Sequence, residues 1–290
     1  MNAHALLLVG GSAVLHATWN YFAKRASDQV AFMFLMMAAS AVALVGVLAW
    51  LVANGTQFPP WYLPVAGGLC QALYSYLMGR GYECGDLSHV YPLARGLAPA
   101  IIALVAWPLL HEGLTLIGAA GIALVVLGTL TLNTTSAREL FNGQSLRALC
   151  VPASRWALAA AVMIAAYHMV DKAGARASSP LAYLAVMYLW LTAFLWPLTL
   201  TARGAQQVAD EWRRNWKFVL MGTVLCFAAY FMVVSAMMLS KVAYVASLRN
   251  IGILLGVVLG ATALREEGVW WRLAGAGLMV AGIVAIAVGG

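Results

Sequence analysis

Apolar residues run along this chain in long blocks, and each block is about as long as a membrane-crossing helix. Such a helix needs about 20 predominantly apolar residues. Ten segments meet this requirement: residues 3–23, 30–53, 61–82, 88–110, 114–133, 156–175, 181–202, 216–239, 242–264 and 268–288. The connections between them are short, apart from 134–154 and 203–215. The pattern therefore predicts ten transmembrane helices and no extramembrane domain.

Composition supports the same fold class, an all-α integral membrane protein. The chain is 63% hydrophobic and only 9% charged, whereas an average soluble domain carries about 25% charged residues. Such a chain could not cover a water-exposed surface, which excludes an ordinary soluble enzyme or nucleic-acid-binding protein. The apolar blocks are also continuous, whereas the strands of a membrane β-barrel alternate apolar and polar residues.

The two halves of the chain resemble each other. A shift of 154 residues places Arg95 on Arg249, and a shift of 151 residues near the start of each half places Asn20 on Asp171. We therefore expect a first five-helix repeat over 1–133, a connecting loop over 134–153 and a second five-helix repeat over 154–290. Because five is an odd number, the second copy enters the membrane with the opposite orientation. The predicted fold is ten transmembrane helices as two inverted five-helix repeats, an architecture typical of secondary transporters.

Charge asymmetry bears on the orientation. The net charge is +7, and eleven Lys and Arg residues fall in or beside the odd-numbered connections against three for the even-numbered ones. By the positive-inside rule, the odd-numbered connections face the cytoplasm and both termini lie outside.

Polar groups inside membrane spans are costly and are candidates for function. On the first span, His16 and Asn20 share one helical face, with Trp19 beside them. Their counterparts on the sixth span include His168 and Asp171. There, Asp171 could hold the ammonium group of a zwitterion. The alternatives are hydrogen bonds between neighbouring helices and, for Asp171, an interfacial ion pair with Lys172. Histidines also titrate near neutral pH, which suits proton coupling.

Two arginines lie within the fourth and ninth spans. Arg95 and Arg249 could clamp a carboxylate or phosphonate, because the planar guanidinium suits such groups; the alternative is an arginine with a structural role. Aromatic residues are expected to complete the site. The predicted substrate-binding residues are His16, Trp19, Asn20, Tyr76, Tyr91, Arg95, His168, Asp171, Tyr230, Tyr244, Arg249 and Asn250.

These features resemble the drug/metabolite transporter superfamily, in its EamA-type branch of ten-helix permeases. The matching residues are Glu112 and Glu266, which close the fourth helix of each repeat, and the glycine-rich fifth and tenth helices. The segment from His16 to Asn20 is similar to a subgroup of which some members are associated with phosphonate use. The resemblance implies a metabolite or amino-acid permease, often an exporter, that does not hydrolyse ATP. It also implies termini inside the cell, contrary to the charge count, so the orientation stays open.

The predicted function is therefore a secondary transporter of the cell (inner) membrane, a multi-pass permease that moves a small polar or zwitterionic organic solute, such as an amino acid, by alternating access. The alternatives are a transporter of a small organic anion such as a phosphonate, and a non-transporting membrane scaffold. We expect no enzymatic activity, because the spans hold no paired carboxylates or metal-ligand spacing. We expect neither a cofactor nor a bound metal. The expected partners are a small-molecule substrate and the lipid bilayer, with protons as a candidate coupling ion, no nucleic acid, and a monomer or weak homodimer.

Overall fold

A computed structural model of the 290-residue chain describes residues 3–84, 87–111, 113–132, 134, 151–250 and 269–289. The part of the chain that it describes is all-helical, with nine helices and no strand. They are α1 (Ala3–Arg25), α2 (Gln29–Ala53), α3 (Tyr62–Cys84), α4 (Leu87–Leu110), α5 (Leu116–Leu132), α8 (Pro152–Ala177), α9 (Pro180–Leu239), α10 (Val242–Arg249) and α12 (Val269–Gly289).

The helix count differs from the ten predicted because two predicted spans belong to one element. α9 runs for 60 residues and contains non-helical backbone at Gly204 (φ 77°, ψ 160°) and at Asn215 (φ −125°, ψ 16°). A positive φ suits glycine, which lacks a Cβ atom, so the chain turns there and helical structure resumes at once. The connection expected over 203–215 is thus largely helical. The ninth predicted span is described only as far as Asn250, so its remainder lies outside the described residues, as do Glu112 and Glu266.

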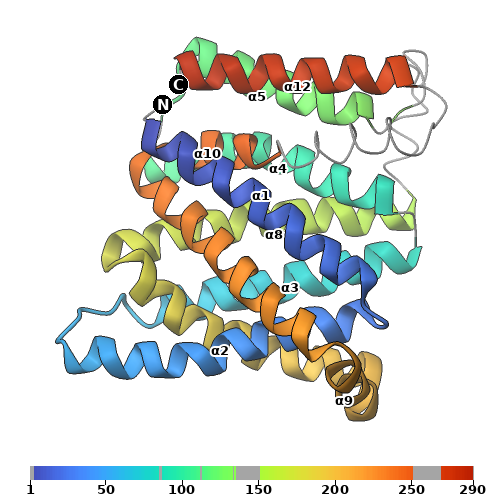
Figure 1. The fold of residues 1–290 in the computed structure, drawn as a ribbon. Helices are drawn as coiled ribbons and strands as arrows, with labels where there is room; N and C mark the ends of the chain where they lie inside the picture. The colour runs from blue at the N-terminus through green and yellow to red at the C-terminus, as the bar shows by residue number, and fades with distance from the viewer. Residues whose placement is uncertain are drawn as a thin grey trace.

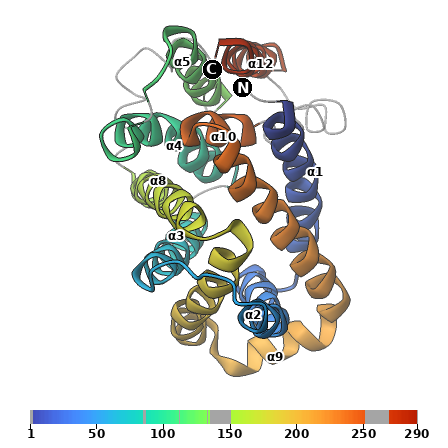
Figure 2. The same cartoon turned by 90° about the vertical axis from the view of Figure 1, so that its left-hand side faces the viewer.

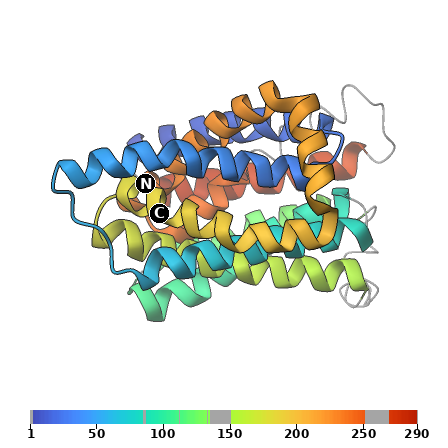
Figure 3. The same cartoon turned by 90° about the horizontal axis from the view of Figure 1, so that it is seen from below.

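Three of the described helices are long and apolar enough to cross a membrane: α2, α8 and α9. Shorter apolar stretches occur within α1, α4, α5 and α12. The helices lie side by side along one axis of the bundle, and both ends of the chain lie at the same end of it (Figure 1). α9 turns back on itself at the opposite end, so its two halves run in opposite directions (Figures 1 and 3). These features are those of an integral membrane helical bundle.

The outermost pairs are α5 with α12 on one side and α2 with α9 on the other (Figure 2). Between them, α3 packs on α8, and α1 packs on α9. The seam between α5 and α12 is built on glycine. A Cβ atom on Gly121 would lie 2.8 Å from the carbonyl oxygen of Gly282, and one on Gly128 would lie 2.6 Å from that of Gly275. The residue number on α12 falls from 282 to 275 as the residue number on α5 rises from 121 to 128, so the two helices are antiparallel. Only glycine permits so close an approach.

Candidate functional site

A pocket of about 750 Å³ lies between α1, the start of α2, α3, α4 and the first half of α9. It is found at the end of the bundle where α1 joins α2 and where α9 turns back, at the right of Figure 1. His16 and Trp19 line it from α1, Tyr76 from α3 and Arg95 from α4. Apolar helices thus enclose a chamber with polar and charged groups on its walls, as expected of a ligand-binding site.

Arg95 lies eight residues after the start of α4, well inside the bundle. Its Nη2 atom donates a hydrogen bond to the hydroxyl oxygen of Tyr74 (3.3 Å), and its Cζ atom lies 6.0 Å from the centre of the Tyr74 ring. The aromatic face and the hydroxyl group hold the guanidinium by a cation–π contact and a hydrogen bond. Arg95 therefore presents a fixed positive charge to the pocket.

His16 and Trp19 contact each other one helical turn apart on α1. The indole Nε1 of Trp19 donates a hydrogen bond to Nδ1 of His16 at 3.2 Å, and the rings meet edge to face at 4.9 Å between centroids. A histidine that accepts at Nδ1 has its proton on Nε2 in the neutral form. In this arrangement His16 adds a hydrogen-bonding ring to the pocket and no charge.

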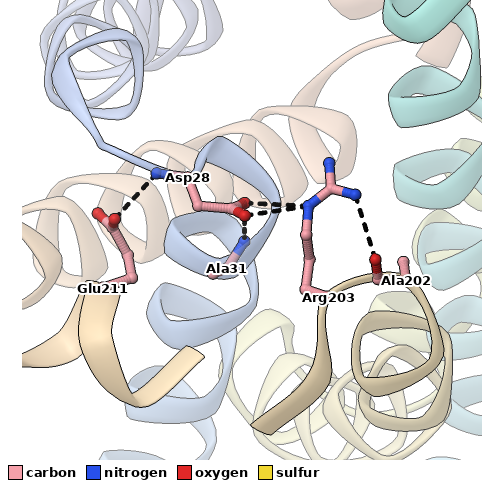
Figure 4. Close-up of polar contacts among 5 residues, drawn as sticks. All are labelled: Asp28, Ala31, Ala202, Arg203 and Glu211. Carbon is pink, nitrogen blue, oxygen red and sulfur yellow. Dashed lines mark hydrogen bonds and ion pairs between the residues drawn. The ribbon is translucent and has the colours of Figure 1, made fainter. Parts of the chain in front are cut away.

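The connection between α1 and α2 is tied to α9 at the mouth of the pocket (Figure 4). Asp28 caps α2 by accepting from the backbone N–H of Ala31 at 3.0 Å, and its carboxylate lies 3.0 Å from Nε of Arg203. The backbone N–H of Asp28 donates in turn to the Glu211 carboxylate at 2.9 Å. Glu211 also accepts from Asn215 at 2.7 Å. These contacts join the first helix connection to the turn of α9.

A second polar cluster lies deeper, outside the pocket lining, around Asp171. Asp171 is completely buried in α8. One carboxylate oxygen accepts a hydrogen bond from Tyr183 at 2.6 Å, and the other accepts from Tyr230. Nε2 of Gln71 on α3 donates to the Tyr230 hydroxyl at 3.0 Å. The cluster therefore joins α3, α8 and both halves of α9 around one acidic group.

The neighbouring Lys172 is buried too, with 2% of its surface exposed. Its ammonium group donates to the backbone carbonyl of Ser240, at the end of α9, over 2.9 Å. Both residues of the ion pair considered from the sequence are thus buried within the bundle, Asp171 against two tyrosines and Lys172 against the end of α9. Tertiary packing covers a helix end that the sequence places near the membrane surface.

Arg249 adjoins the Asp171 cluster from the end of α10. Its Cζ atom lies 5.6 Å from the centre of the Tyr230 ring, and Nη1 lies 3.4 Å from Nε2 of His168. Nδ1 of His168 is 2.6 Å from the backbone carbonyl of Ile164, which can only accept, so Nδ1 carries the proton. Nε2 is then the acceptor for Arg249. Both guanidiniums of the predicted arginine pair therefore contact tyrosine rings, Arg95 that of Tyr74 and Arg249 that of Tyr230.

The predicted site residues thus separate into groups. His16, Trp19, Tyr76 and Arg95 line the pocket, whereas His168, Asp171, Tyr230 and Arg249 form the deeper cluster. Asn250 links the two, because its side-chain amide lies 3.4 Å from the backbone carbonyl of Arg95.

Three predicted residues do not join either group. Tyr244 is buried elsewhere, with its hydroxyl 3.4 Å from the hydroxyl of Thr115 before α5 and with Lys241 above its ring at 5.1 Å. The side chains of Asn20 and Tyr91 lie outside the described part of the structure.

Residues that the sequence did not single out also take part. Tyr183 donates to Asp171 from the first turn of α9, and Asp28 and Arg203 meet at the pocket mouth. Thr199 lines the pocket although it looks like one polar residue in an apolar span. A tyrosine or threonine in an apolar helix carries little signal of its own, because its partner is set by the packing of distant helices.

The fold and pocket define a helical membrane protein with an internal polar chamber. The model of the EamA-like transporter family matches residues 3–134 and 152–288. The chain belongs to this family, which confirms the resemblance to the drug/metabolite transporter superfamily. Its members are integral membrane proteins that transport small solutes and are generally not enzymes.

Comparison with solved structures gives the same fold. One crystal structure, described only as that of a protein, has a TM-score of 0.70 and 18% sequence identity, and the match covers 99% of each chain. At this identity the similarity concerns the fold alone. The comparison with curated proteins found no match.

Proposed function

We propose that this protein is a secondary transporter of the cell (inner) membrane that moves a small polar organic solute by alternating access. The observation that carries the proposal is an asymmetry between the two ends of the bundle. The pocket lies toward the end where α1 joins α2, whereas the Asp171 cluster ties α8 to both halves of α9 nearer the other end. A chamber that is reached from one side and closed on the other is what one state of a carrier requires.

The closed end is held by directional contacts as well as by apolar packing. Tyr183 and Tyr230 donate to the same carboxylate, and Lys172 donates to Ser240 at the end of α9. Such hydrogen bonds can be exchanged for bonds to water as the helices separate, so their net cost of breakage is modest, about 1.5–3 kcal/mol each, because each involves a charged group. Contacts of this strength suit an end that opens and closes during transport.

The glycine seam supports an inverted relation between the two halves. The shift of 154 residues makes Gly275 the counterpart of Gly121, and Gly282 the counterpart of Gly128. Gly121 meets Gly282, and Gly128 meets Gly275. Exchange of the two halves therefore converts one contact into the other, as a twofold axis across these antiparallel helices would do. Inverted repeats give carriers two related arrangements that open to opposite sides.

The substrate is proposed to be a polar or zwitterionic solute such as an amino acid, or else a small organic anion such as a phosphonate. In the first mode Asp171 holds an ammonium group. Both of its carboxylate oxygens accept tyrosine hydrogen bonds here, so an ammonium group would replace these donors as the closed end opens. An ionisable residue inside a membrane bundle is also a common proton carrier, and Asp171 is our candidate for proton coupling.

The test is counterflow in proteoliposomes that contain the purified full-length protein. Vesicles preloaded with an unlabelled amino acid, phosphonate or small dicarboxylate are placed in a trace of the same labelled solute, with and without a pH gradient. We expect saturable uptake that depends on the preloaded solute for at least one member of the panel. Flux that does not saturate and does not depend on preloading would indicate a channel instead. The absence of any flux across the panel would count against transport.

A further inference from the structure

The pocket is enclosed by an excess of positive charge. Among the described lining residues, three arginines (Arg80, Arg95 and Arg203) stand against a single acid, Asp28. The carboxylate of Asp28 already forms an ion pair with Arg203 at 3.0 Å. His16 accepts a hydrogen bond at Nδ1 and adds no charge in that arrangement. Among the described lining residues, the positively charged side chains thus outnumber the negatively charged ones by two.

The arginines are distributed from the mouth to the interior. Arg203 lies at the turn of α9 and contacts the connection between α1 and α2 (Figure 4). Arg80, near the end of α3, has its Cζ atom 5.8 Å from the centre of the Trp156 ring. Arg95 lies further in, against Tyr74. A cleft lined by one sign of charge, with walls of low dielectric constant, concentrates small ions of the opposite sign.

Thr199 adds a second, independent observation. It lines the pocket from α9 and is buried to 1% exposure, and its hydroxyl oxygen has no hydrogen-bond partner. Several other threonines in the described helices donate to a carbonyl one turn back, as Thr131 does to Leu127 at 2.8 Å. A buried hydroxyl without a partner is costly. An oxygen atom of a bound anion would accept from it.

The chamber offers fewer partners to a zwitterion than to an anion. Its ammonium group needs an acceptor of negative charge, and Asp28 is the acidic side chain among the described lining residues. Asp171 is not in the lining, and both of its oxygens are occupied by tyrosines.

We infer that the pocket selects a small organic anion, bearing a carboxylate or a phosphonate, with Arg95 as the inner cationic anchor and the Thr199 hydroxyl as a hydrogen-bond donor to the same anionic group. The inference rests on the proposed transport function and names its substrate class. Arg80 and Arg203 would attract the anion at the mouth, and Arg95 would bind it inside. A guanidinium binds carboxylate and phosphonate groups through parallel N–H donors.

The test is a binding measurement that does not depend on transport. The thermal unfolding temperature of the full-length protein in detergent is measured with phosphonoacetate, with succinate and with the neutral analogue succinamide, at constant ionic strength. Ligands that bind the folded state raise this temperature. We expect at least one of the two anions to raise it, and succinamide to leave it unchanged.

Two matched variants then test the role of the Thr199 hydroxyl. Thr199→Val should weaken binding of the stabilising anion on the order of tenfold and should not lower the unfolding temperature of the empty protein, because the hydroxyl has no partner to lose. Thr131→Val, a buried threonine on α5 that lies outside the pocket lining, should leave anion binding unchanged.

Stabilisation by succinamide equal to that by the anions, or the absence of stabilisation by either anion, would overturn the inference. So would equal loss of binding in the two variants. Counterflow of a neutral solute or zwitterion by the same protein would leave the transporter proposal intact while the anion inference fails. Selective anion binding without counterflow would support the anion inference and count against the transporter proposal.

Discussion

The hydroxyl group of Tyr230 donates a hydrogen bond to the carboxylate of Asp171, although the two residues are 59 positions apart in the chain. The same hydroxyl accepts from Gln71, and the ring of Tyr230 lies beneath the guanidinium of Arg249. One side chain thus connects an acid on α8, an amide on α3 and a cation on α10. Opening the bundle between these helices requires these contacts to separate.

Removal of the Tyr230 hydroxyl should therefore favour opening at this end. Cys70 adjoins Gln71 and is partly buried, so its reactivity reports opening here. The reporter protein keeps Cys70 and has Cys84, Cys150 and Cys226 changed to serine. We expect Tyr230→Phe to increase the labelling rate of Cys70 by a membrane-impermeant maleimide about tenfold or more, because loss of one hydrogen bond to a charged group shifts the equilibrium by about 1.5–3 kcal/mol. Tyr244→Phe is the control, since its hydroxyl lies 3.4 Å from that of Thr115, before α5, and not in the Asp171 cluster. Equal labelling in the two variants would contradict the assignment of a closing contact.

Arg95 should be required for efficient transport. Arg95→Gln removes the charge but retains hydrogen-bonding capacity, and we expect at least a tenfold loss of counterflow rate at low solute concentration, about 1.4 kcal/mol or more. Arg95→Lys keeps the charge without the planar fork and should fall between this variant and the wild type. Arg249→Gln should also slow transport, through loss of its contacts with Tyr230 and His168. Normal insertion with wild-type rates in both glutamine variants would refute the role of the arginine pair.

Asp28 combines a helix cap with an ion pair, and the two roles can be separated. The side chains of Asp28 and Arg203 are 24% and 27% exposed, so their ion pair should contribute only about 0–1 kcal/mol. Loss of an N-cap costs about 1 kcal/mol. We expect Asp28→Asn, which still accepts from Ala31, to lower the thermal unfolding temperature less than Asp28→Ala does. The reverse order in detergent melting curves would show that charge outweighs capping here.

The glycine seam between α5 and α12 should not accept a methyl group. A Cβ atom on Gly282 would lie 2.5 Å from the Gly121 carbonyl oxygen, whereas one on Gly277, on the same helix, would meet nothing within 4 Å. We expect Gly282→Ala to destabilise the protein by about 1–3 kcal/mol through overpacking. Gly277→Ala should be neutral or slightly stabilising, because alanine favours helix over glycine. Thermal unfolding of the purified variants checks the difference, and equal melting temperatures would contradict the seam.

Cys84 reports the orientation of the chain. It is exposed at the end of α3, on the same side as the pocket mouth. If the charge count is correct, this side faces the cytoplasm. A membrane-impermeant maleimide should then label Cys84 in inside-out vesicles but not in intact cells, in a protein with Cys150 changed to serine. Labelling in intact cells would instead place the termini inside, as the family resemblance implies.

Most helix positions were predictable because the membrane imposes a simple requirement. A segment in lipid must be apolar over about 20 residues and must satisfy its own backbone hydrogen bonds, so hydropathy alone locates α2 or α8. Hydropathy does not indicate whether a polar connection is coil or helix. The connection predicted over 203–215 is largely helical, with breaks in the backbone of α9 at Gly204 and Asn215.

The candidate site was predicted in part. Charged groups such as Arg95 and Asp171 are conspicuous in apolar spans, because burying them in lipid is costly. Their partners are not conspicuous. Tyr183 and Thr199 are ordinary residues of apolar helices, and their roles come from positions in space relative to α8 and to the pocket. Tyr244 was expected in the site on sequence grounds, yet packing places it beside Thr115 instead.

The sequence by itself determined the class of protein, the approximate spans and the existence of two similar halves, because hydropathy, charge and internal repetition are properties of linear order. Only the tertiary structure decided that Arg95 faces the pocket while Asp171 is enclosed by tyrosines, and that the glycines of α5 meet those of α12. These outcomes depend on which helix faces pack together. Contacts between residues far apart in the chain set that choice, and no local pattern encodes them.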